Sequence, residues 1–153
     1  MLAQHPRRRP GRPNEDGFTL IELLVTVAII GIITALAIPT LLNSLERGRQ
    51  AATLALIRAI GDALQVYSND NEVYPIVADT VTLLPLLQPY ADNLDHRDEW
   101  GFPLHYESDG ENYTIESYGR NGADDDPNLT PETRYVFELD ILYSNGFLLN
   151  GPE

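Results

Sequence analysis

The sequence contains neither cysteine nor lysine among its 153 residues. Without cysteine, no disulfide can brace the chain and no thiolate can act as a nucleophile or a zinc ligand. Without lysine, all ten basic residues counted against the 23 acidic ones are arginine, and the net charge is −13. Nucleic-acid binding depends on basic groups that neutralise phosphate, so this composition argues against it.

Signatures of catalysis are missing as well. The sequence has no G-x-S-x-G nucleophile motif and no glycine-rich phosphate loop. Its three histidines, His5, His96 and His105, have no mutual spacing that suggests a metal cage. We therefore predict that the protein is not an enzyme.

Charge is absent from a long stretch near the N-terminus. No residue between Glu22 and Glu46 is charged, and in residues 23–42 only threonine side chains can form hydrogen bonds. About 20 apolar residues at roughly 1.5 Å rise each span the ~30 Å hydrocarbon core of a bilayer. We expect this stretch to lie in a membrane, where an unpaired Glu22 carboxylate would cost about 2.5–3.5 kcal/mol at the bilayer centre and needs a partner.

A cut after Gly17 would supply that partner. The new α-amino group of Phe18 would lie one helical turn before Glu22, and the amine of one subunit would face the carboxylate of a staggered neighbour. Three other interpretations compete: a secretory signal peptide with an A-x-A site at residues 35–37, a plain single-pass anchor, and a buried core helix. The internal charge and the length of the apolar run disfavour the first and the last.

The run GFTLIELLVTVAIIGII at residues 17–33 resembles the class III signal sequence of type IV pilins and type II secretion pseudopilins. The resemblance implies that a prepilin peptidase cuts between Gly17 and Phe18 and N-methylates Phe18. It further implies that Glu22 sets the register of assembly. The apolar run would first anchor the subunit and then form the filament core, with Pro39 loosening the helix so that subunits pack.

Four segments follow from these observations. Residues 1–17 form a cleaved leader, 18–42 the transmembrane and filament-core helix, 43–68 its amphipathic continuation, and 69–153 a globular domain. Arginines ahead of a membrane helix hold that end in the cytoplasm, so the globular domain is expected on the outer side. A basic nucleic-acid-binding tail is the alternative for the leader. Removal of the leader leaves 6 basic and 21 acidic residues, a net charge of −15.

The helix is predicted to continue beyond the membrane as an amphipathic helix. Apolar residues at helical spacing form one stripe, and polar residues occupy another face. These residues are Ile57, Ile60, Leu64 and Tyr67 on the stripe, and Arg58, Asp62 and Gln65 on the polar face. We expect the stripe to pack against the globular domain, and the alternative is a coiled-coil seam between subunits. Turn-forming residues at 69–72 end the helix.

The globular domain is predicted to contain a short helix and three strands. Asp79 or Thr80 caps a helix that ends at Leu87, whose leucines 83, 84, 86 and 87 pack on the long helix. Period-two patterns predict strands at 102–107 and 112–118, joined by a turn at 108–111, and a third strand at 135–141. The fold class is therefore α+β and pilin-like, a long N-terminal helix packed against a small antiparallel sheet.

Later residues carry a narrower resemblance. DEWGFPLHY at 98–106 and YTIESYGRNG at 113–122 resemble the motifs of the major pseudopilins of type II secretion. In that family the loop after the second strand binds calcium, which replaces the disulfide of many pilins. Hard oxygen ligands suit Ca²⁺. The resemblance implies that the calcium ligands lie among Ser117, Tyr118, Asp124, Asp125 and Asp126, and a solvated acidic loop is the alternative.

These patterns predict a structural subunit of a type II secretion pseudopilus that drives protein export across the outer membrane. The implied partners are copies of the chain itself, minor pseudopilins, the prepilin peptidase and the inner-membrane assembly platform. The chain would reside in the inner membrane as a single-pass protein and then in a periplasmic pseudopilus. The alternatives are a type IV pilin that forms surface fibres for adhesion, motility or DNA uptake, and a membrane-anchored binding module that never polymerises.

Overall fold

The computed structural model describes residues 17–124, 137 and 139–151. In chain order the elements are α1 (Leu20–Asn71), α2 (Thr80–Leu87), β1 (His105–Ser108), β2 (Tyr113–Ser117), the 3-10 turn η1 (Gly119–Asn121), β3 (Ile141–Ser144) and β4 (Phe147–Asn150). The chain divides into two compact units, Met1–Thr40 and Leu41–Glu153, which we call unit 1 and unit 2. Helix α1 contributes residues to both.

Helix α1 has defined caps at both ends. At its start, Thr19 and Glu22 form a capping box, in which each side chain accepts a hydrogen bond from the backbone N–H of the other. At its end, Glu72 adopts a left-handed conformation (φ 67°) and its N–H donates to the carbonyl of Ser68. This is the αL C-cap that turn-forming residues favour, so the predicted stop at 69–72 is confirmed. Pro39 lies inside the helix, which continues beyond it.

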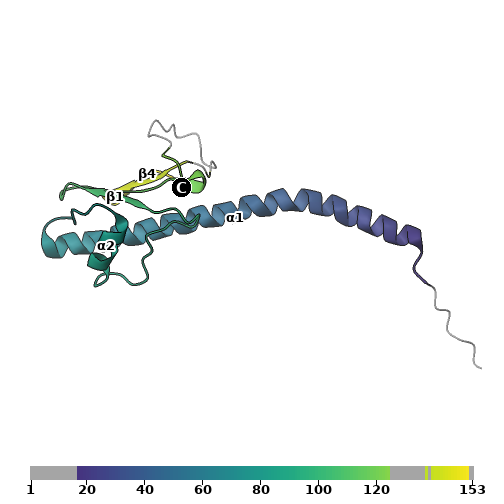
Figure 1. The fold of residues 1–153 in the computed structure, drawn as a ribbon, viewed down its shortest axis with the longest axis horizontal. Coiled ribbons are helices and arrows are strands. Elements are labelled where there is room, and N and C mark those ends of the chain that lie inside the picture. Colours follow the sequence, from purple (N-terminus) through teal and green to yellow (C-terminus); the bar gives the residue numbers. More distant parts are fainter. Residues whose placement is uncertain (1–16, 125–136, 138, 152–153) are drawn as a thin grey trace, which may run out of the picture. The chain divides into compact units, whose positions relative to one another are not determined.

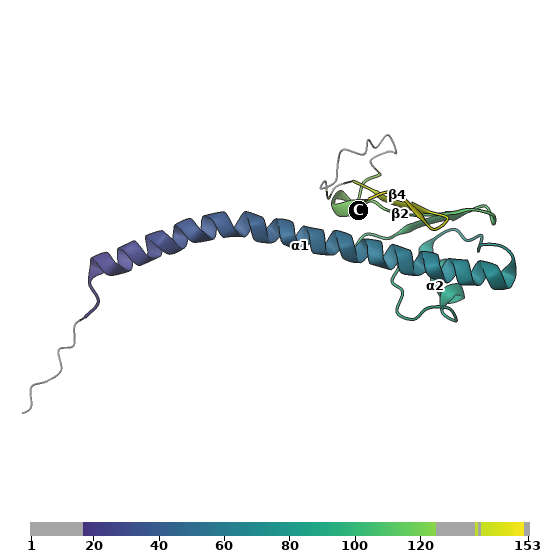
Figure 2. The same ribbon diagram turned by 180° about the vertical axis from the view of Figure 1, so that it is seen from behind.

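The core of unit 2 lies where one stripe of α1 meets α2 and the sheet. Figures 1 and 2 show the sheet along one side of the C-terminal part of α1 and α2 on another. Ile57, Ile60 and Leu64 are fully buried, whereas the polar face predicted for this part of α1 is exposed. The stripe therefore packs within the chain, as predicted, and the coiled-coil alternative is wrong for these three residues.

Helix α2 also follows its prediction closely. The Asp79 carboxylate caps it by accepting a hydrogen bond from the backbone N–H of Thr82 at 2.8 Å. Leu83 and Leu87 have no exposed surface and belong to the core. Leu86, in contrast, is 40% exposed, so the expectation that all four leucines of this segment pack on α1 is wrong for this one.

The sheet is antiparallel with strand order β1-β2-β3-β4, so the prediction of three strands is wrong for the described residues. The predicted third strand, 135–141, lies partly outside those residues. Of its described members, Phe137, Leu139 and Asp140 precede β3, and only Ile141 belongs to it. Instead, β3 and β4 form a C-terminal hairpin. Asn145 and Gly146 at its turn both have positive φ, which is the geometry that Asn-Gly favours in two-residue hairpins.

Candidate functional site

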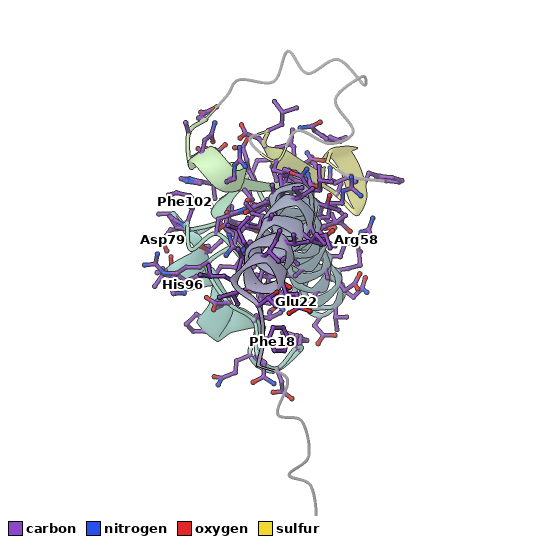
Figure 3. The ribbon with its side chains drawn as sticks, turned by 90° about the vertical axis from the view of Figure 1, so that its right-hand side faces the viewer. Phe18, Glu22, Arg58, Asp79, His96 and Phe102 are labelled. Atoms are coloured by element: carbon purple, nitrogen blue, oxygen red, sulfur yellow. The ribbon has the colours of Figure 1, made fainter. Side chains whose placement is uncertain are left out.

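The first candidate site is the start of α1. The Glu22 carboxylate accepts hydrogen bonds through Oε2 from the backbone N–H of Thr19 at 2.8 Å and from its hydroxyl at 2.9 Å. Phe18 is 86% exposed, and a Cβ added at Gly17 would meet nothing within 4 Å. Figure 3 labels Phe18 and Glu22 at this end of the helix. The predicted cleavage bond is therefore accessible in the single chain, and the carboxylate is held by its own first turn.

The hydrogen bonds from Thr19 to Glu22 were not predicted from the sequence. The signal was present, because Thr19-Leu20-Ile21-Glu22 has the T-x-x-E pattern of a capping box in front of an apolar run. The pairing with a neighbour's Phe18 amine stays a prediction, since it requires a second copy of the chain.

Beyond Glu22, the apolar side chains of unit 1 have no core to enter. Large apolar residues from Leu20 to Ile38 are 49–83% exposed. Among the described residues, α1 is the one helix that is long and apolar enough to cross a membrane, and none of its apolar window is buried within the chain. This surface must be covered by lipid or by protein, because a soluble chain rarely exposes so large an apolar patch.

The second candidate site is a cluster of three carboxylates, which we call the acidic cluster: Glu116, Asp124 and Asp140. One ligand atom from each lies within 4.8 Å of those of the other two. Glu116 pairs with Leu142 across β2 and β3, and Asp140 directly precedes β3, two residues before Leu142. Gly122, the C-cap residue of η1, adopts a left-handed conformation with a φ of 63°, and Asp124 follows two residues later.

Electrostatics at the acidic cluster favour a cation. Burial raises the pKa of Glu116 to about 6, and the neighbouring charges of Asp140, Asp124 and Glu107 act in the same direction. Asp140 is only 3% exposed, so water screens its charge weakly. Carboxylate oxygens are the ligands of hard cations. Beside the cluster is a cavity of about 460 Å³, lined in part by Glu116 and Asp124. The cluster can therefore hold a metal ion.

Of the ligands predicted from sequence, only Asp124 is found in the acidic cluster. Asp125 and Asp126 lie outside the described residues. The Ser117 hydroxyl donates to Asp98 Oδ2 at 2.8 Å, and the Tyr118 ring stacks on His105 with a centroid separation of 4.2 Å. The side chains of Ser117 and Tyr118 thus have other partners.

Glu116 and Asp140 were missed in the sequence. They are 24 positions apart, and they meet only through the register of β2 and β3, which no local pattern reveals. The alternation of Glu116 with the inward-facing Ser117 was the available hint that its carboxylate lies on the outer face of the sheet.

Known proteins resemble this chain over most of its length. Residues 12–38 match the family model of the prokaryotic N-terminal methylation motif, and residues 40–132 match that of type II secretion system (T2SS), protein G. The chain is 30% identical to the type II secretion system core protein G of Escherichia coli (strain K12) over 132 residues, which cover 83% of this chain and 89% of that protein. It is 31% identical to the protein of the same name from Aeromonas hydrophila, over 73% of this chain and 90% of the relative. No solved structure gives a significant match.

Proposed function

Since this chain belongs to the type II secretion system protein G family, whose members are major pseudopilins and not enzymes, we propose that it polymerises into a periplasmic pseudopilus that drives protein export. The observation that carries the proposal is the exposed apolar surface of unit 1. In the free subunit this surface lies in the inner membrane, and in the filament it packs against the same surface of neighbouring copies. The globular part of unit 2 then lies on the periplasmic side.

Processing creates the partner of Glu22. We propose that a prepilin peptidase cuts between Gly17 and Phe18 and N-methylates Phe18. Because both hydrogen bonds from Thr19 use Oε2 of Glu22, Oε1 can accept the amine of a neighbour while the capping box persists. The ion pair sets the stagger between subunits, and Pro39, which removes one backbone N–H from the helix, lets α1 adjust during packing.

A pair of variants separates assembly from helix capping. Glu22→Ala removes both the capping carboxylate and the proposed intermolecular pair, whereas Thr19→Ala removes the capping hydroxyl and leaves the Glu22 carboxylate in place. We expect Glu22→Ala to insert into the membrane normally and to form no filaments, and Thr19→Ala to assemble. Filament yield is measured by sedimenting polymers from lysed spheroplasts and immunoblotting, and membrane insertion by fractionation. Equal defects in the two variants would show that Glu22 acts only as a cap.

We also propose that the ion held by the acidic cluster is calcium. The cluster supplies three carboxylates, and further oxygens from backbone carbonyls at Ser117 and Tyr118 and from Asp125 and Asp126 would complete the six to eight that calcium takes. Bound calcium would brace the loop after β2 in a domain that has no cysteine with which to form a disulfide.

The cellular role is tested by deleting the gene and measuring two products in the same cells. A secretion pseudopilin predicts that enzymes disappear from the culture supernatant while surface fibres stay unchanged. The runner-up, a type IV pilin that builds surface fibres, predicts normal secretion and missing fibres. Minor pseudopilins and the inner-membrane assembly platform are the expected partners, and co-purification from crosslinked membranes would identify them.

A further inference from the structure

Residues 97–103, which lie between α2 and β1, form a closed turn that we call the Asp98 turn. The backbone N–H of Asp98 donates to the carbonyl of Phe102, and the N–H of Gly101 donates to the carbonyl of Asp98. Gly101 has a φ of 91°, a conformation that residues with a side chain rarely adopt. Arg97 closes the turn by donating from its guanidinium to the Gly101 carbonyl at 2.7 Å.

The Asp98 carboxylate is buried and ties this turn to β2. It is 5% exposed, and its Oδ1 accepts hydrogen bonds from the backbone N–H groups of Trp100 and Phe102 at 3.0 and 2.8 Å. Its Oδ2 accepts from the hydroxyl of Ser117, which in turn accepts from the N–H of Gly119. Because a buried carboxylate left without donors is costly, these bonds hold the turn and the end of β2 in one arrangement.

The same turn contacts α1 on its other side. The indole N–H of Trp100 donates to Glu46 Oε2 at 2.7 Å, and the backbone N–H of Glu99 donates to the hydroxyl of Thr53 at 3.1 Å. Glu46 is the first charged residue after the apolar run of α1. The Asp98 turn therefore lies between that point of the helix and the loop that follows β2.

The Asp98 turn contacts Ser117 at the end of β2 and Gly122 in the loop that follows, and both residues lie next to members of the acidic cluster. Ser117 directly follows Glu116, and Gly122 lies two residues before Asp124. The Phe102 ring occupies the space that a Cβ on Gly122 would need, so the ring packs directly on the loop backbone. A cation that draws Glu116 and Asp124 together acts on both contacts at once, whereas repulsion among the uncompensated carboxylates pushes the same two contacts apart.

We propose that Asp98 is a positioning residue that couples cation binding at the acidic cluster to the contact of Trp100 with Glu46 of α1. This inference rests on the metal part of the proposed function. With the cation bound, residues 116–124 hold Ser117 and Phe102 in place, and the turn keeps its indole on Glu46. Without the cation, the turn loosens and the indole leaves the helix. Coupling of this kind is reciprocal, so weakening the contact on α1 weakens cation binding by the same factor.

The experiment uses the full chain in detergent micelles, with calcium chloride as the probe and calorimetry as the measure of binding. Trp100 is the only tryptophan, so its emission reports the contact with α1 directly. In the wild type we expect chelation of calcium to shift the emission to the red, with the same midpoint as calcium release. Asp98→Asn should bind calcium about tenfold more weakly, and its emission should stay red-shifted throughout.

Two further variants make the test specific. Glu46→Ala removes the acceptor of the indole on α1, together with the ion pair between Glu46 and Arg49, and we expect it to lower calcium affinity by about fivefold. Asp109→Asn is the matched control, since Asp109 likewise accepts two backbone N–H groups in a turn, at the opposite end of the β1–β2 hairpin. It should leave both calcium affinity and the emission shift as in the wild type.

The outcomes separate the two proposals. Calcium binding to the wild type with constant Trp100 emission, or unchanged affinity in both Asp98→Asn and Glu46→Ala, would overturn the coupling and leave the metal site standing. The absence of any calcium binding by the wild type would overturn the metal proposal itself, and the coupling with it.

Discussion

The two halves of α1 differ in how their apolar side chains are covered. In unit 1, Ile32 and Leu36 are 65% and 73% exposed, whereas in unit 2 Ile57 and Leu64 have no exposed surface. Both halves are helical and rich in apolar residues, but the second half is amphipathic and covers its one apolar stripe with α2 and the sheet. The first half is apolar on all sides, so its stabilisation comes from lipid or from other copies of the chain.

The comparison teaches that secondary structure alone does not define a fold. Unit 2 obtains its stability within one chain, and its substitutions are expected to change the free energy of unfolding. Unit 1 obtains its stability from outside the chain, and its substitutions are expected to change insertion and assembly instead. Matched substitutions in the two halves of one helix test this distinction.

The largest expected contrast is between Leu64→Ala and Leu36→Ala. The first creates a cavity in the core and should lower the free energy of unfolding of the globular part by about 2–5 kcal/mol. The second removes an exposed side chain and should change that free energy by less than about 0.5 kcal/mol. Urea unfolding of the full chain in micelles, followed by circular dichroism, measures both. Similar losses in the two variants would show that the halves are not energetically distinct.

A smaller contrast is expected between Gly61→Ala and Gly31→Ala. A Cβ at Gly61 would lie 2.5 Å from Cε1 of the buried Tyr143, so the helix and the sheet would have to separate. Overpacking of this kind costs about 1–3 kcal/mol. At Gly31 the added Cβ meets nothing within 4 Å in the single chain. We therefore expect a lower melting temperature only for Gly61→Ala. Loss of filaments in Gly31→Ala with unchanged stability would locate a close helix contact in the assembly.

The smallest expected effect is the pH dependence contributed by Glu116. Its pKa is raised from 4.5 to about 6 in the folded chain, so between these values the folded state holds more protons than the unfolded state. By linkage, this group makes the free energy of unfolding fall as pH rises through that window. In the presence of a chelator, Glu116→Gln should lack this fall. Thermal unfolding between pH 4 and about pH 7 measures the difference, with the exposed turn residue Glu111→Gln as the control. Parallel profiles for wild type and Glu116→Gln would contradict the expectation.

Local patterns predicted most of the fold. The stop of α1 at residues 69–72, the cap of α2 at Asp79 and the first hairpin are each encoded within a few neighbouring residues, and the structure confirms them. The predicted start of the first strand at residue 102 is wrong, because β1 begins at His105. The C-terminal hairpin was missed although Asn145-Gly146 is a strong turn signal, because the alternation of the preceding residues placed a strand too early.

The acidic cluster depended on information that is not local. Asp124 was predicted because the family resemblance implies a calcium loop after the second strand, but Glu116 and Asp140 come together only once β2 and β3 pair. The Asp98 turn is a similar case, since its bonds to Glu46 and Thr53 join residues that are 54 and 46 positions apart. The D-x-W-G motif was recognised from the sequence, but its contact with α1 required the tertiary structure.

The exposed start of α1 also makes the chain chemically addressable. The sequence has no lysine, so once the chain is cut after Gly17 the α-amine of Phe18 is its only primary amine. Phe18 is 86% exposed, and a reagent in solution can therefore reach it. A reagent specific for primary amines would attach at this one position. Methylation, which makes the amine secondary, or burial of the amine against a neighbour's Glu22 would block the reaction. The extent of labelling would then report processing and assembly of the unmodified sequence without any engineered tag.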